Sequence, residues 1–394
     1  MTTFSPATEA QWLKKVEGVL KGADFTEKLV STMADGVIRQ PLYAPVTGAP
    51  RAVRPLHGPW EIFARMDAPA PAVANAQARD DIGNGVNGVV LVMADAATAR
   101  GAGLALTDLT AALHGLPLHA TSLRLEGSSA AAVALARHID KQPLDPARLA
   151  VHFGLTEAGP VAALMKQGFA GPFMVADGRA AHEQGLTAAE ELGVALAEGV
   201  RHLRSLENLG DDDLARAVSM VLAADQDMFL TLAKFRAARL LWARVLEAAK
   251  LPAAALALHG ETSWRMMATL DPHTNILRAT AAVFGAGLGG ASSFTVLPFS
   301  QAQGLPNSFA RRVARNVQNV LLEESELWRV DDPAAGAGVI EDLTAQLCEK
   351  AWGVFQAAET GRRPKPRPDA ATSLPTVGTT AYRLKDEYSP EVEA

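Results

Sequence analysis

The chain has 394 residues, 48% of them hydrophobic, which is enough to bury one large core or several smaller ones. Its 43 acidic and 37 basic residues give a net charge of −6, a balance that offers no basic surface for nucleic acid. The single cysteine, Cys348, rules out an intramolecular disulfide and suits a reducing compartment. No signal core precedes the first helical pattern, and the uncharged stretch 279–299 is interrupted by glycine and serine. We therefore expect a cytoplasmic protein without nucleic-acid or membrane partners.

Residues 1–60 are predicted to form an N-terminal arm. In TEAQWLKKVEGVLKG, residues Trp12, Val16, Val19 and Leu20 are apolar at helical spacing, and Gly22 ends the pattern. Residues 36–60 are rich in proline and glycine, so we expect an extended segment. Such a segment cannot bury itself and is expected to lie along another surface, here that of a partner chain.

Residues 61–360 alternate between short apolar runs and helical runs. Strands are predicted at 88–94, 118–127, 147–153, 172–178, 255–260 and 293–299, with a long helical block over about 211–249 and a helix over 272–284. Repeated strand–helix units imply parallel strands with right-handed crossovers. Their number favours a closed (β/α)8 TIM barrel in the α/β class over an open sheet. The proline-rich residues 361–394 predict an extended tail that orders against a partner.

The strongest polar pair lies at the end of one predicted strand. His259 and Glu261 are two residues apart, so their side chains share one face, and Thr262 and Ser263 follow directly. In a barrel this end is the mouth where barrel enzymes carry out their chemistry. The pair is either an acid/base site or a polar rim that satisfies its own hydrogen bonds, and the spacing alone does not separate the two.

Several long blocks resemble one family in the same order. Residues 233–245, 262–280, 305–325 and 328–336, together with WLKKVEGVLKG and DGVIRQPLY near the N-terminus, resemble the methylmalonyl-CoA mutase family. The resemblance covers about residues 10–360 and implies a (β/α)8 barrel. Active members of this family use adenosylcobalamin to interconvert methylmalonyl-CoA and succinyl-CoA. Some members are heterodimers of an active large subunit and a similar, inactive small subunit.

The differences from the active pattern are specific. GRAAHEQG places Arg179 and Ala180 where active members have Tyr and His, and its own histidine, His182, is shifted by two positions. RPLHGPW (54–60) lacks the arm tyrosine, and F-D-E-A has become Phe299-Ser-Gln301-Ala302. The active H-S-Q-T-S-G keeps its histidine, threonine and serine but has Glu261 for Gln. The resemblance therefore implies no catalytic residues and only vestigial substrate-binding positions, which are His259, Glu261, Thr262, Ser263 and Arg236.

A cobalt site is also not expected in this chain. The family's cobalamin domain has D-x-H-x-x-G, whereas Asp271-Pro-His273 is followed by Ile276 where glycine is required. We expect Asp271 to cap a helix with Pro272 at its first position. The sequence ends before the family's cobalamin domain would begin, so we expect no cofactor or metal on this chain and adenosylcobalamin on the partner subunit.

One predicted strand carries charges where the family leaves a channel for CoA. In ATSLRLEG, residues Arg124 and Glu126 share one face because a strand has a period of two. If that face is inward, the two side chains fill the barrel, and as buried charges they must pair. We expect them to pair across the interior and close the channel.

Three functions follow from the resemblance. The first is a non-catalytic small-subunit-like chain that stabilises a catalytic large subunit in a heterodimer, or that pairs as a homodimer. The second is an active acyl-CoA mutase barrel whose cobalamin domain is on a separate polypeptide. The third is a free-standing scaffold that has left the mutase complex.

Overall fold

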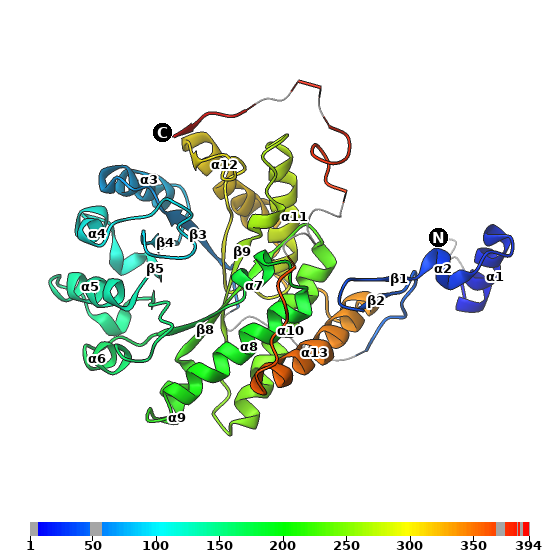
Figure 1. Ribbon diagram of the computed structural model, residues 1–394, viewed down its shortest axis with the longest axis horizontal. Helices are drawn as coiled ribbons and strands as arrows, with labels where there is room; N and C mark the ends of the chain where they lie inside the picture. The colour runs from blue at the N-terminus through cyan, green and yellow to red at the C-terminus, as the bar shows by residue number, and fades with distance from the viewer. Residues whose placement is uncertain (1–6, 48–56, 368–374, 384, 387–388, 394) are drawn as a thin grey trace.

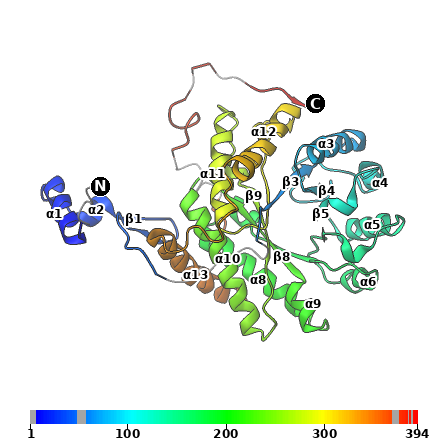
Figure 2. The ribbon, with the colours of Figure 1, turned by 180° about the vertical axis from the view of Figure 1, so that it is seen from behind.

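The computed structural model describes residues 7–47, 57–367, 375–383, 385–386 and 389–393. Its centre is an eight-stranded parallel sheet in the order β6-β5-β4-β3-β10-β9-β8-β7. A parallel bridge between Leu155, which follows β6, and Met174 of β7 closes the two edges of the sheet. Backbone hydrogen bonds from Phe153 to Pro172 and from Leu155 to Phe173 support it, and they bring the sheet round into a barrel. The predicted (β/α)8 barrel is confirmed (Figures 1 and 2). The strands are β3 (Glu61–Met66), β4 (Gly88–Val92), β5 (Ser122–Glu126), β6 (Val151–His152), β7 (Met174–Asp177), β8 (Val218–Ala224), β9 (Ala257–Thr262) and β10 (Ser293–Thr295).

Each strand is followed by at least one helix that covers the outside of the barrel (Figure 1). The apolar core lies between the sheet and these helices, whereas a small apolar cluster of Phe63, Val90, Val92 and Ala99 is separate from it. The helices are α3 (Pro71–Gly83), α4 (Leu109–Ala112), α5 (Ser129–Asp140), α6 (Val161–Lys166), α7 (Arg179–Glu183), α8 (Ala188–Ser205), α9 (Asp211–Arg216), α10 (Met228–Ala248), α11 (Thr274–Leu288), α12 (Ser308–Asn319) and α13 (Gly338–Glu359).

Two strands of the barrel, β3 and β8, were not predicted from the sequence. The helical block predicted over about 211–249 was wrong in part, because it holds β8 between α9 and α10. All seven residues of β8 are buried, so its sequence has no alternation of apolar and polar residues that would mark a strand. The other missed strand, β3, follows directly on the proline-rich arm.

The predicted helix start at Asp271 was also wrong. Asp271 has a positive φ of 45° and Pro272 precedes the helix, so α11 begins at Thr274 with His273 as its N-cap residue. Asp271 still ties the turn, because its carboxylate accepts a hydrogen bond from the Thr274 hydroxyl. The ring of His273 lies 4.9 Å from that of Phe299, which indicates packing at this turn.

The described part of the arm has two portions. Helices α1 (Glu9–Leu20) and α2 (Phe25–Leu29) have no buried residue and project away from the barrel (Figure 1). The short strands β1 (Ser31–Thr32) and β2 (Ile38–Arg39) pair with each other, and Ile38 exchanges two hydrogen bonds with Gln346 of α13. Residues 31–47 therefore lie along this chain's own helix. The predicted segment 48–56 of the arm is outside the described residues.

Candidate functional site

Four charged side chains form a ring inside the barrel mouth, which we call the charge ring: Arg65, Glu126, Arg179 and Glu261. Arg179 contacts Glu126 at 2.7 Å and Glu261 at 2.9 Å. Arg65 contacts Glu261 at 3.1 Å and Glu126 at 3.6 Å. All four are buried, and positive and negative groups alternate around the ring. The ring joins β3, β5 and β9 to the start of α7, which places it at the carboxyl ends of the strands.

Additional carboxylates and a hydroxyl complete the ring. Asp67 accepts from Arg65 Nε at 3.0 Å, and Asp177 accepts from Arg179 Nη2 at 2.6 Å. The Thr98 hydroxyl donates to Glu126 at 2.5 Å. Burial by itself opposes ionisation of Glu126, but the adjacent Arg179 and Arg65 outweigh it and lower the pKa of this carboxyl to about 2. Glu126 is therefore ionised at neutral pH.

Arg124 lies inside the barrel on the same strand as Glu126, but its hydrogen-bond contact is with a residue of β6. Its guanidinium is 3.3 Å from Nδ1 of His152, and Arg124 is buried whereas His152 is half-buried. Burial lowers the pKa of Arg124 to about 10. Burial and the charge of Arg124 together lower the pKa of His152 to about 3, so this imidazole is neutral and can accept the hydrogen bond. Arg124 and Glu126 both occupy the interior, with ion or hydrogen-bond partners on other strands.

His259 lies inside the barrel on the same face of β9 as Glu261. Its Nδ1 is 2.8 Å from the Ser293 hydroxyl, its Nε2 is 3.1 Å from the Thr295 hydroxyl, and its ring packs edge-on against Phe63. Burial and the charge of Arg124 hold the pKa of His259 well below its usual value. Both ring nitrogens already have hydrogen-bond partners within the protein, so His259 is a neutral, satisfied group in this structure.

Thr262 and Ser263 are engaged outside the charge ring. The Thr262 hydroxyl accepts from the Leu297 backbone N–H at 2.8 Å. The Ser263 hydroxyl is 2.7 Å from Nε2 of His182, whose Nδ1 lies 3.3 Å from Glu191. Lys234 Nζ contacts the same carboxylate at 2.6 Å. All members of this chain of contacts are buried, so it is a structural network that ties β9 to α7, α8 and α10.

Arg236 is in a different part of the molecule. It lies on α10, fully buried, and its guanidinium pairs with Glu341 of α13 at 2.8 Å and with Asp332. The structure thus brings His259 and Glu261 together on one inward face, gives Thr262 and Ser263 backbone and histidine partners, and places Arg236 in the helical layer.

Arg65 was not predicted as a site residue, and no partner was predicted for Arg179. Both arginines come from positions far from Glu261 in sequence, 196 and 82 residues away. The signal that could have identified Arg65 is the pattern of EIFARMD, a strand with charges two residues apart at its carboxyl end.

A pocket of about 230 Å³ opens at the barrel mouth beside the charge ring. Arg65 and Glu261 form part of its wall, together with Trp264, Gly304 and Leu305. Arg100 stacks on the Trp264 ring at 4.0 Å and pairs with Glu183. Sites for drug-sized ligands and cofactors usually enclose about 300–1,000 Å³, so this pocket is smaller than such a site.

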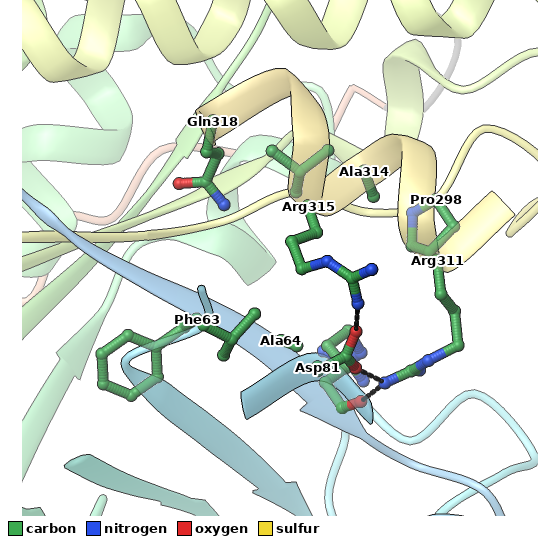
Figure 3. A pocket seen from close by; sticks show the side chains of 11 residues that line it. Phe63, Ala64, Asp81, Pro298, Arg311, Ala314, Arg315 and Gln318 are labelled. Carbon is green, nitrogen blue, oxygen red and sulfur yellow. Dashed lines mark hydrogen bonds and ion pairs between the residues drawn. The ribbon is translucent and has the colours of Figure 1, made fainter. Parts of the chain in front are cut away.

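A second pocket, of about 20 Å³, lies between β3 and helices α3 and α12 (Figure 3). Asp81 of α3 accepts from Arg311 at 2.5 Å and from Arg315 at 2.7 Å, both on α12. A space of this size holds about one water molecule. The pocket therefore belongs to the packing of the two helices.

Neither a metal site nor a membrane-spanning helix is found among the described residues. Among them, no group of three or more His, Cys, Asp or Glu side chains is arranged to hold a metal ion. Within the same residues, no helix combines the length and the apolar character needed to cross a membrane.

The matching family model and three similar proteins all carry the name methylmalonyl-CoA mutase. The model of the family described as methylmalonyl-CoA mutase matches residues 173–361. A methylmalonyl-CoA mutase small subunit from Streptomyces virginiae is 37% identical over 90% of this chain and 64% of its own length. The small subunit from Propionibacterium freudenreichii subsp. shermanii is 31% identical over 90% of this chain and 62% of its own length.

A methylmalonyl-CoA mutase from Rhizobium meliloti is 38% identical over only 45% of this chain and 26% of its own length. The fold is that of a (β/α)8 barrel. The chain belongs to the methylmalonyl-CoA mutase family, and its likeness to small subunits extends over most of its length. It spans somewhat less than two thirds of the length of those small subunits.

Proposed function

We propose that this chain is a non-catalytic, small-subunit-like partner that stabilises the catalytic large subunit of an adenosylcobalamin-dependent acyl-CoA mutase, in a heterodimer. The observation that carries the proposal is the charge ring, whose buried, mutually paired side chains occupy the barrel mouth. A substrate entering here would have to break these ion pairs and leave charges buried without partners, which costs about 3–5 kcal/mol for each broken pair.

The same residues do not fit the family's cofactor. The mouth pocket of about 230 Å³ is too small for a cobalamin and an acyl-CoA together. In place of the active tyrosine, Arg179 is locked between Asp177, Glu126 and Glu261. We therefore assign adenosylcobalamin and the isomerisation of methylmalonyl-CoA and succinyl-CoA to the partner, and derive no catalytic step for this chain.

Helix α1 is the part of this chain best suited to contact the partner. Trp12, Val16 and Val19 lie at helical spacing, and Val19 is 79% exposed. None of the residues of α1 is buried against the barrel. An apolar stripe on a helix that projects from its own domain fits an interface with another chain.

The test is co-expression with the mutase large subunit encoded in the same genome, with a tag on this chain. We expect the large subunit to copurify and its isomerase activity to survive heating longer in the complex. Replacing Trp12, Val16 and Val19 together by serine should reduce recovery of the large subunit, while the same change at Lys14, Lys15 and Glu17 on the polar face should not.

Two outcomes would overturn this function. Turnover of an acyl-CoA by this chain with adenosylcobalamin and a separate cobalamin-domain protein, with no large subunit present, would establish the split-mutase alternative. Failure to recover the large subunit under conditions where both chains are folded would favour a free-standing scaffold.

A further inference from the structure

The C-terminal tail contacts three connections on one side of the barrel. The Arg367 backbone N–H donates to the carbonyl of Gln184 at 2.6 Å, in the connection that follows β7. The carbonyl of Val377 accepts from Arg278 of α11 at 2.6 Å, after β9. The strand β12 (Val392–Glu393) pairs with β11 (Leu305–Pro306), after β10. All three contacts are on the carboxyl side of the sheet, and Figure 1 shows the tail ending beside α12.

The last of these contacts falls on the wall of the mouth pocket. Gly304 and Leu305, which line the pocket, are also the residues against which β12 lies. A Cβ at residue 304 would be 3.1 Å from Cγ2 of Val392, and Gly304 has a φ of 154°. Only glycine combines this backbone conformation with so close an approach. β12 therefore lies directly against residues 304 and 305, which form this part of the pocket wall.

The pairing of β11 with β12 is short and weak. Each strand has two residues, and Pro306 has no N–H to donate to its partner. Val392 remains 38% exposed, so little apolar surface is buried. Isolated two-stranded pairings are marginal in water, and segments with few buried contacts open at low free energy. The barrel does not need β12 for its own ring of strands.

We propose that the C-terminal strand β12 is a displaceable latch that gates access to the pocket at the barrel mouth. When β12 is paired, residues 304–306 hold the rim beside Trp264 and the charge ring. When β12 leaves, this segment loses its partner strand and the pocket widens to solvent. The proposal does not depend on the partner role, since it concerns only contacts within this chain.

Trp264 supplies a direct readout because it lines the pocket. Acrylamide quenching of tryptophan fluorescence is measured in the full chain and in a chain lacking residues 389–394, each with and without Trp264→Phe. The difference between the members of each pair isolates the contribution of Trp264. We expect that contribution to be quenched more strongly in the truncated chain, with a loss of deuterium-exchange protection over residues 300–306. Equal quenching and equal exchange in the two chains would overturn the latch.

A reversible lock keeps the test independent of truncation. Leu305 and Glu393 are paired across the two strands, so Leu305→Cys and Glu393→Cys can form a disulfide, in a Cys348→Ser background. We expect the oxidised protein to show weaker quenching of Trp264 than the same protein after reduction. Locked and reduced forms that are quenched alike, with circular dichroism showing both folded, would contradict the gate.

Discussion

The side chain of Glu261 holds two arginines together in the barrel mouth. Its two carboxylate oxygens contact different arginines, one from β3 and one from α7. A neutral amide at this position would leave both guanidinium groups facing each other with one carboxylate fewer. Glu261 and Glu126 each contact both arginines, and together they allow Arg65 and Arg179 to share the interior.

Removing the charge of Glu261 should destabilise the protein strongly. We expect Glu261→Gln to lower the free energy of unfolding by about 3–5 kcal/mol, because it removes a carboxylate that two buried guanidinium groups share. Urea unfolding measures the change. Glu183→Gln is the matched control, since Glu183 also pairs with an arginine but is partly exposed, and surface pairs contribute about 0–1 kcal/mol. A loss at residue 261 no greater than that of the control would show that the ring does not bear on stability.

His152 makes the stability of the folded chain depend on pH in acid. Its pKa is lowered to about 3 in the folded chain by burial and Arg124, whereas an unfolded histidine has a pKa of about 6.5. The folded state therefore resists protonation of His152. The stability linked to this group is complete above pH 6.5 and is lost as pH falls from 6.5 towards 3.

We expect His152→Gln to flatten the fall of unfolding free energy between pH 6.5 and 4, by up to about 1.4 kcal/mol per pH unit. Urea titrations at several pH values measure the slope, and His119→Gln on the exposed surface is the control. An unchanged slope in the His152 variant would mean that this imidazole does not titrate with folding.

At the scale of elements, helix α13 holds the described part of the arm. Gln346 pairs with both backbone groups of Ile38, and Val46 donates to the carbonyl of Gly336 at 3.0 Å. At the start of α13, a Cβ on Gly338 would be 2.1 Å from the carbonyl oxygen of Ala44. The lack of a side chain at residue 338 is therefore what lets the arm lie against the helix.

Gly338→Ala should release residues 36–47 without weakening α13, because alanine is a better helix former than glycine by about 1 kcal/mol. Hydrogen–deuterium exchange should become faster in this segment and stay unchanged in the barrel strands. Gly353→Ala in the same helix is the control, since its Cβ would meet no atom within 4 Å. Faster exchange of the arm in both variants, or in neither, would contradict this account.

The prediction of elements failed where burial removed the pattern. Six of the barrel strands could be predicted, because each is a short apolar run bounded by helical stretches. β8 could not, since a strand buried on both faces between two helices has the same apolar composition as a helix. Asp271 has the residue type of a cap, but its positive φ places it in the turn before the helix.

At the scale of the whole molecule, the repeat of strand and helix predicts the closed barrel, because right-handed crossovers leave few other arrangements. Less of the candidate site could be predicted from the sequence. The inward face of His259 and Glu261 follows from spacing alone, but Arg65 and Arg179 reach them only through closure of the sheet. Charges that pair over 82 and 196 residues leave no local pattern.

The bridge between Leu155 and Met174 gives the barrel a seam. On one side, β3 to β6 are contiguous in both sequence and space, and on the other, β7 to β10 are as well. The chain thus consists of two half-barrels, and the region matched by the family model begins at residue 173, directly beside the seam. The charge ring spans the two halves, with Arg65 and Glu126 from the first and Arg179 and Glu261 from the second, so ion pairs join the halves in addition to the pairing of β3 with β10 and the contact at the seam.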